Sequence, residues 1–226
     1  MQAIVIAYNQ EEREFFSYTL RHVGLSVART AEIKLVSSSL LTNPVDLIFF
    51  APNPNTNWVD EIAAIRAISQ APLFLLIDTL LEDTYCEMLD AGVDLILKRP
   101  LSARVLSRYA KVFLRRAGSV PASMLSTINT EKIALDPSTR TVQRINSEPV
   151  QLTPLEFRLL YVLMTNRDQV IPTDSIIDRV WGYTGDGNRE LVRGLVRRLR
   201  RKIEPDPKNP VFIHTHLGIG YRFSIE

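Results

Sequence analysis

Residues 189–203 read RELVRGLVRRLRRKI, and this stretch decides how the C-terminal half is interpreted. Apolar residues recur at steps of three and four, which predicts an α-helix with one buried stripe. The stripe would consist of Val192, Val196 or Leu195, Leu199 and Ile203. Residues 189–202 hold seven basic residues and one acidic residue, a net charge of +6. A local excess of this kind predicts a surface that binds an anion.

The arginines of this helix are expected on the side away from the stripe. Arg193, Arg197, Arg200 and Arg201 should project outward, with Arg198 on the flank. An α-helix fits the major groove of DNA, and arginine can donate two bonds to guanine or clamp a phosphate. Gly194 lowers helix stability by about 1 kcal/mol relative to alanine, so we expect a close approach there to a groove wall or to the core. The alternative is a merely solvated basic face.

The segments on either side of this helix complete a winged helix-turn-helix pattern. Thr153-Pro154-Leu155-Glu156 predicts a capping box with a proline in the first turn, opening a helix that ends near Thr165. Residues 174–180 predict a second helix, and residues 132–152 short strands. Residues 212–225 predict a hairpin with a glycine-rich turn. The sequence therefore predicts an α+β winged-helix DNA-binding domain over residues 131–226.

The N-terminal half alternates short apolar runs with amphipathic stretches. The runs predict strands at 3–7, 25–28, 45–51, 73–77 and 93–97, and the stretches predict helices at 11–23, 58–69, 82–90 and 103–116. Buried strands separated by helices indicate an α/β doubly wound domain with a parallel five-stranded sheet over residues 1–116. Residues 117–130 are small and polar with Pro121, which predicts an interdomain linker.

The composition narrows the class of protein. No uncharged apolar run approaches the roughly 18 residues of a membrane helix, and the N-terminus does not resemble a signal peptide. We therefore expect a cytoplasmic protein without a membrane partner. Cys86 is the only cysteine and is interpreted as an inert thiol rather than a redox switch. His22, His214 and His216 form no catalytic or metal-ligating pattern, so we expect no enzyme, cofactor or metal.

The C-terminal half resembles the effector domain of OmpR/PhoB-type response regulators. The segments that carry the resemblance are LTPLEFRLL at 152–160, VWG at 180–182, VRRLRRKI at 196–203 and GIGYR at 218–222. It implies that the third helix enters the major groove, that Gly182–Asn188 can contact RNA polymerase and that the hairpin is a wing beside the minor groove. The DNA-contacting residues would be Arg189, Arg193, Arg197, Arg198, Arg200, Arg201, Lys202, Thr215, His216 and Tyr221.

This half departs from the family pattern at some positions. Leu217 stands where the wing often has an arginine, and Arg193 and Leu195 replace a frequent aspartate and histidine. The family's sequence preference is therefore not carried over.

The N-terminal half resembles a flavodoxin-like receiver domain by its layout, by Ala91-Gly92-Val93-Asp94 and by Arg99-Pro100. A receiver binds Mg²⁺ and phosphate through carboxylates, because Mg²⁺ prefers hard oxygen ligands and a carboxylate oxygen attacks the phosphoryl donor. The aligned positions of this degenerate phosphorylation pocket are Tyr8 and Asn9 for the acidic pair, Ala51 for the phosphoacceptor, Ile77 for the switch residue and Arg99 for the lysine. We expect a pseudo-receiver whose emptied pocket is plugged by Tyr8 or holds a small ligand. Asp46 is interpreted as a strand-start residue rather than a displaced acceptor.

In this family phosphorylation favours a dimer through the fourth helix, fifth strand and fifth helix. Tyr85, Leu95, Val105 and Tyr109 occupy positions there that charged residues often fill, so we expect a constitutive homodimer held by apolar burial. Alternatively, these residues belong to the receiver's own core. The resulting prediction is a phosphorylation-independent, sequence-specific DNA-binding transcription regulator. The alternative is an adaptor whose pseudo-receiver docks another regulator without DNA binding.

Overall fold

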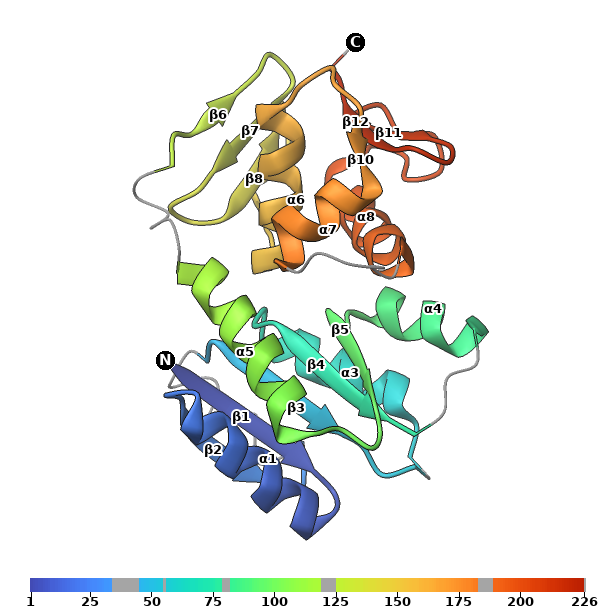
Figure 1. Cartoon of the computed structure of the whole chain (residues 1–226). Coiled ribbons are helices and arrows are strands. Elements are labelled where there is room, and N and C mark those ends of the chain that lie inside the picture. Colours follow the sequence, from blue (N-terminus) through green and yellow to red (C-terminus); the bar gives the residue numbers. More distant parts are fainter. Residues whose placement is uncertain (34–44, 55, 79–81, 119–124, 183–188, 226) are drawn as a thin grey trace. The chain divides into compact units, whose positions relative to one another are not determined.

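The computed structural model describes residues 1–33, 45–54, 56–78, 82–118, 125–182 and 189–225 (Figure 1). The chain forms two compact units, Met1–Leu114 and Arg115–Glu226. Within the described ranges, no helix combines the length and the apolar character that crossing a bilayer requires.

The first unit is a parallel five-stranded sheet with helices on both faces. Its strands lie in the order β2-β1-β3-β4-β5, which confirms the doubly wound, receiver-like fold. The elements are β1 (Gln2–Ala7), α1 (Gln10–His22), β2 (Ser26–Thr30), β3 (Leu47–Ala51), α3 (Trp58–Ile68), β4 (Leu73–Ile77), α4 (Glu82–Ala91), β5 (Leu95–Lys98) and α5 (Ala103–Gly118).

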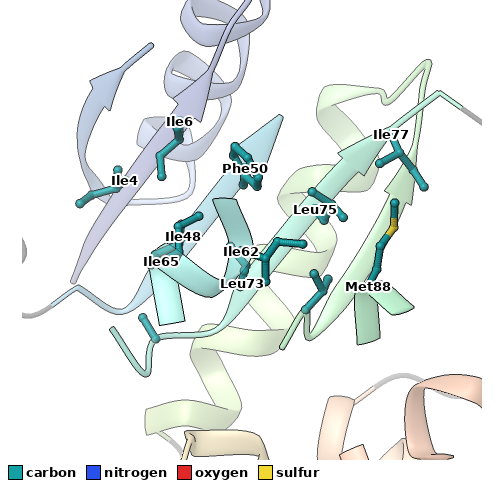
Figure 2. Packing of buried hydrophobic residues seen from close by; sticks show 12 residues of the cluster. Ile4, Ile6, Ile48, Phe50, Ile62, Ile65, Leu73, Leu75, Ile77 and Met88 are labelled. Atoms are coloured by element: carbon teal, nitrogen blue, oxygen red, sulfur yellow. The ribbon is translucent and has the colours of Figure 1, made fainter. Parts of the chain in front are cut away.

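Both faces of this sheet are buried, which explains why its strands are continuous apolar runs. On one face, alternate residues of β1, β3 and β4 pack against α3 and α4 (Figure 2). The labelled members of that cluster are Ile4, Ile6, Ile48, Phe50, Ile62, Ile65, Leu73, Leu75, Ile77 and Met88. On the other face, Phe49 packs against Phe16 of α1 and Phe74 against Phe113 of α5, each with ring centroids 4.6 Å apart.

A buried ion pair ties α3 to the start of β5. Arg66 Nη2 lies 2.6 Å from Asp94 Oδ2, and the Asp94 side chain is fully buried. The same carboxylate oxygen accepts the backbone N–H of Leu73 at 2.9 Å. The Arg66 guanidinium also donates to the carbonyl of Gly92, through Nε at 2.9 Å and Nη2 at 2.7 Å. This arginine therefore satisfies several buried acceptors at once.

The second unit is a winged helix-turn-helix, as the sequence predicted. A four-stranded sheet in the order β6-β7-β8-β9 precedes the helices, and a three-stranded sheet in the order β10-β12-β11 carries the wing. The elements are β6 (Ile128–Asn129), β7 (Ile133–Asp136), β8 (Thr141–Arg144), β9 (Val150–Gln151), α6 (Pro154–Thr165), β10 (Ile171–Pro172), α7 (Thr173–Trp181), α8 (Arg189–Ile203), β11 (Ile213–His216) and β12 (Gly220–Phe223). Strands β6 and β10 were not predicted, and β6 lies inside the range expected to be a linker.

The capping box forms as expected and also anchors α8. Thr153 Oγ1 accepts the backbone N–H of Glu156 at 3.3 Å, and Glu156 Oε2 accepts the backbone N–H of Thr153 at 2.8 Å. Lys202 Nζ donates to the same Glu156 oxygen at 2.7 Å. Trp181, at the end of α7, is buried in the core. These contacts fix α8 against the other two helices.

Candidate nucleic-acid interface

Helix α8 has one side that belongs to the core. Its buried apolar residues are Leu191, Val192, Leu195, Val196, Leu199 and Ile203. Leu195 and Val196, which the sequence left as alternatives for one position of the stripe, are thus both buried. Gly194 is buried too, so its missing side chain lies on the core side of α8 and not toward a groove wall.

The opposite side of α8 carries an arginine row, defined as Arg189, Arg193, Arg197 and Arg201. All four residues are exposed and stand at every fourth position. Twelve residues of α-helix rise about 18 Å, so the row runs as an inclined strip along most of the helix. Arg193 Nη1 lies 2.7 Å from Glu190 Oε1, one turn earlier. The row concentrates positive charge on the helix side that does not contact the core.

Three other basic residues of α8 do not join the arginine row. Arg198 is buried. The prediction that Arg200 projects outward is wrong, because its guanidinium is half-buried and donates to the carbonyl of Ile213. Lys202 Nζ donates to Glu156 and to the carbonyl of Gln151 at 3.0 Å. Periodicity alone could not show this, because the acceptors come from distant parts of the chain.

The wing is a short hairpin with an apolar tip. Its turn contains Gly218 at φ 74°, a conformation that favours glycine. Leu217 is 90% exposed and Ile219 57% exposed. On β11, Thr215 is exposed and His216 half-buried, so both remain candidate DNA contacts.

Tyr221 behaves differently from the other predicted wing contacts. Its side chain is buried, and burial raises the pKa of its phenol above the ordinary 10.0. That Tyr221 contacts DNA stays a prediction, because its phenol also interacts with Arg193 and Arg197 of the exposed row. Nearby Arg200, Arg193 and Arg197 act in the opposite direction on this pKa, which places the ring beside α8.

Strand β10, which sequence reasoning missed, supports the wing from behind. The backbone N–H of Thr173 donates to the carbonyl of Ile219 at 3.0 Å, and Ile171 pairs with Tyr221. A Cβ on Gly220 would lie 1.9 Å from the carbonyl oxygen of Ile171, so only glycine allows this approach. In the sequence, Gly220 as the second glycine of the Gly-x-Gly turn was the signal that could have predicted this close approach of two backbone segments.

The receiver edge, where the strands of the parallel sheet end, contains the positions aligned with phosphorylation residues. Ala51 and Ile77 are buried, and Asn9 Oδ1 caps α1 by accepting the backbone N–H groups of Glu11 and Glu12. Tyr8 is 64% exposed, so the prediction that its ring plugs a pocket is wrong. Asp46 lies before β3 at the opposite end of the sheet and accepts the backbone N–H of Gln2 at 2.7 Å.

An ion pair between Arg99 and Glu12, which the sequence did not predict, lies at this edge of the sheet. Arg99 Nε and Nη2 donate to the two carboxylate oxygens of Glu12, at 2.6 and 2.9 Å. Arg99 Nη1 also contacts Asp78 Oδ2 at 3.4 Å and the Leu76 carbonyl at 3.3 Å. The hydrogen bonds to Glu12 raise the pKa of Arg99. Among the described residues, His, Cys, Asp and Glu side chains form no group of three that could hold a metal ion.

Comparison with known proteins places both units in one family. The model for the C-terminal domain of transcriptional regulatory proteins matches residues 147–223. The DNA-binding response regulator MtrA of Mycobacterium tuberculosis is 36% identical over 171 residues, which cover 75% of this chain and 72% of MtrA. The chain belongs to the OmpR/PhoB family of response regulators.

A further relative and a solved structure match nearly the whole chain. KdpE, the KDP operon transcriptional regulatory protein of Escherichia coli, is 29% identical over 223 residues, 98% of each chain. A solved structure of a RitR mutant matches 98% of each chain with a TM-score of 0.78 and 20% identity, a likeness of fold. As a member of the OmpR/PhoB family, this chain is a DNA-binding transcription regulator.

The surface through which OmpR/PhoB receivers were expected to dimerise is only partly available in this member. Tyr85 and Leu95 are 6% and 3% exposed, so they belong to the receiver's own core and cannot form an apolar dimer face. Val105 is 43% exposed and Tyr109 half-buried. The alternative interpretation is therefore right for two of the four residues.

The predicted RNA polymerase loop, Gly182–Asn188, lies mostly outside the described residues. Gly182 itself ends α7 with φ 87° and donates its backbone N–H to the carbonyl of Ile177. The polymerase contact stays a prediction.

Proposed function

We propose that this response regulator is a sequence-specific transcription regulator that reads duplex DNA with α8 and does not depend on phosphorylation. The arginine row carries the first part of this proposal, because it is exposed while the opposite side of the helix is core. Arginine at such positions can contact phosphates for affinity and guanine edges for specificity. On β11, which Arg200 bonds to α8, Thr215 and His216 are further candidate contacts.

The receiver edge supports independence from phosphorylation. Ala51 stands at the end of β3 and offers no oxygen to attack a phosphoryl donor. The side-chain oxygen of Asn9 is occupied by the N-terminus of α1, and Arg99 is paired with Glu12. These residues supply neither the carboxylates that bind Mg²⁺ nor an unengaged cation for a phosphoryl group.

A dimer through α4 and α5 is a further part of the proposal. Helix α4 has four acidic residues and no basic one, whereas α5 has five basic residues and no acidic one. Opposite charges of this kind favour pairing α4 of one copy with α5 of another, with Val105 and Tyr109 adding apolar contact. Sedimentation of the full chain at tens of micromolar tests this, and a monomer at low ionic strength would exclude the dimer.

The DNA proposal is tested by selecting bound sequences from a random duplex pool and measuring affinity at several salt concentrations. We expect an enriched sequence and a steep fall of affinity with salt, since each phosphate contact adds about one to the log–log slope. Acetyl phosphate or beryllium fluoride should leave the affinity unchanged, while a phosphorylatable relative serves as the positive control. A protein that ignored every duplex but bound another regulator would be the adaptor instead. An affinity that responds to the phosphodonor would overturn the second part.

A further inference from the structure

The wing and α8 are joined by two charged side chains one helical turn apart. We propose that Arg200 and Glu204 are positioning residues that fix the wing against the reading helix and so set DNA affinity without contacting DNA. The inference rests on the proposed function, since it takes α8 and the wing as the two DNA-contacting elements.

Arg200 holds the middle of β11. Its Nε and Nη2 donate to the carbonyl of Ile213 at 3.1 and 2.6 Å, and Nη2 also donates to Thr215 Oγ1 at 2.9 Å. The planar guanidinium thus directs its forked N–H donors toward the wing strand. A lysine at this position could make only part of these bonds from a single nitrogen.

Glu204 holds the beginning of the same strand. Its carboxylate is buried and accepts three consecutive backbone N–H groups, from Val211 at 2.8 Å, Phe212 at 3.1 Å and Ile213 at 2.8 Å. Its own backbone N–H donates to the carbonyl of Arg200 at 2.9 Å. Residues 211–213, which follow α8 in the chain, are therefore hydrogen-bonded to the residue directly after the last turn of that helix.

The wing is also held on its other side. Tyr221, paired with Thr215 across the hairpin, is buried beside α8, and β10 pairs with β12. Arg200 and Glu204 complete this support, and the tip of the wing, Leu217 to Ile219, stays exposed. The angle between the wing and α8 is thus set before DNA arrives.

Such preorganisation changes affinity through entropy. When two contacting elements are already fixed relative to each other, binding of the second adds little ordering cost. If the support is cut, the wing must be ordered on DNA, and the affinity falls although the number of phosphate contacts stays the same. If Arg200 contacted DNA directly, its replacement would instead lower the salt dependence of binding.

The test compares Arg200→Met with Arg201→Met, a neighbouring exposed arginine of the same helix. We measure affinity against salt on the selected duplex, and hydroxyl-radical protection of the DNA in the complex. For Arg200→Met we expect about tenfold weaker binding, an unchanged salt slope, and weaker protection of the wing's nucleotides while that of α8 remains. For Arg201→Met we expect the slope to fall by about one with the whole protection pattern kept.

Glu204→Gln provides a milder change for the case in which Arg200→Met does not fold, because it keeps one acceptor oxygen for the backbone N–H groups of Val211 to Ile213 and alters no predicted DNA contact. It should show the same pattern with a smaller loss. A lowered slope in Arg200→Met, unchanged affinity and protection in both variants, or a wild-type complex without wing protection would each overturn the positioning role. If Arg193→Ala, Arg197→Ala and Arg201→Met all leave binding unchanged, the failure lies in the proposed reading helix instead.

Discussion

The two units use arginine in opposite ways. In the receiver, Arg66 and Arg99 are partly buried, and each is bonded to a carboxylate from a distant element, Asp94 or Glu12. In the winged-helix unit, Arg189, Arg193, Arg197 and Arg201 are exposed along one helix, and the ion pair of Arg193 with Glu190 is local. From this difference we expect an arginine to stabilise the fold when another element supplies its acceptor, and to bind a polyanion when it lies along an exposed row.

The largest effect that would follow from this difference is on the stability of the receiver. Replacing Arg66 with alanine leaves the Asp94 carboxylate buried without its cation, so the free energy of unfolding of the first unit should fall by about 3–5 kcal/mol. Urea denaturation of the full chain, followed by probes in each unit, measures this. The double variant Arg66→Met with Asp94→Asn should recover part of the loss. A change below about 1 kcal/mol would show that the pair is not a support.

The arginine row should show the reverse behaviour. Arg193→Ala and Arg197→Ala should each weaken specific DNA binding by about 1–3 kcal/mol, while the free energy of unfolding changes by less than about 0.5 kcal/mol. Titration of a labelled duplex and urea denaturation give the two values. Arg21→Ala, an exposed arginine of α1, is the matched control and should change neither. A loss of stability without loss of affinity would place the row with the structural arginines.

A smaller effect is expected at the receiver edge. Glu12→Gln removes the charge that Arg99 pairs with but keeps one acceptor oxygen, and both side chains are partly exposed. The free energy of unfolding of the first unit should fall by about 1 kcal/mol, with unchanged DNA affinity. Calorimetry and duplex titration check the two parts. Glu11→Gln, on an exposed neighbour, should have no effect on either. An unchanged free energy of unfolding in Glu12→Gln would show that the pair does not support this edge of the sheet.

The sequence predicted features that depend on local periodicity and spacing, and failed where the partner is distant. The parallel sheet, the capping box at Thr153 and the buried stripe of α8 follow from patterns within a few residues. The inward turn of Arg200 and the pairing of Arg99 with Glu12 depend on residues 13 and 87 positions away. Strand β10 was missed because two residues carry too short a pattern.

The smallest effect concerns Tyr221, which is 7% exposed and whose phenol interacts with arginines of α8. Because burial raises its pKa above 10.0, the folded state holds the phenol proton more tightly than the unfolded state. Its contribution to stability is therefore complete below pH 10 and is lost as the pH rises through the folded pKa. Tyr221→Phe should reduce the fall of the free energy of unfolding as the pH rises above 10. Tyr8→Phe, on an exposed ring, should not change this fall. At neutral pH, duplex titration of Tyr221→Phe tests the predicted DNA contact, because loss of a hydrogen bond to phosphate should weaken binding by about 1 kcal/mol or less. Unchanged affinity would show that the phenol does not contact DNA.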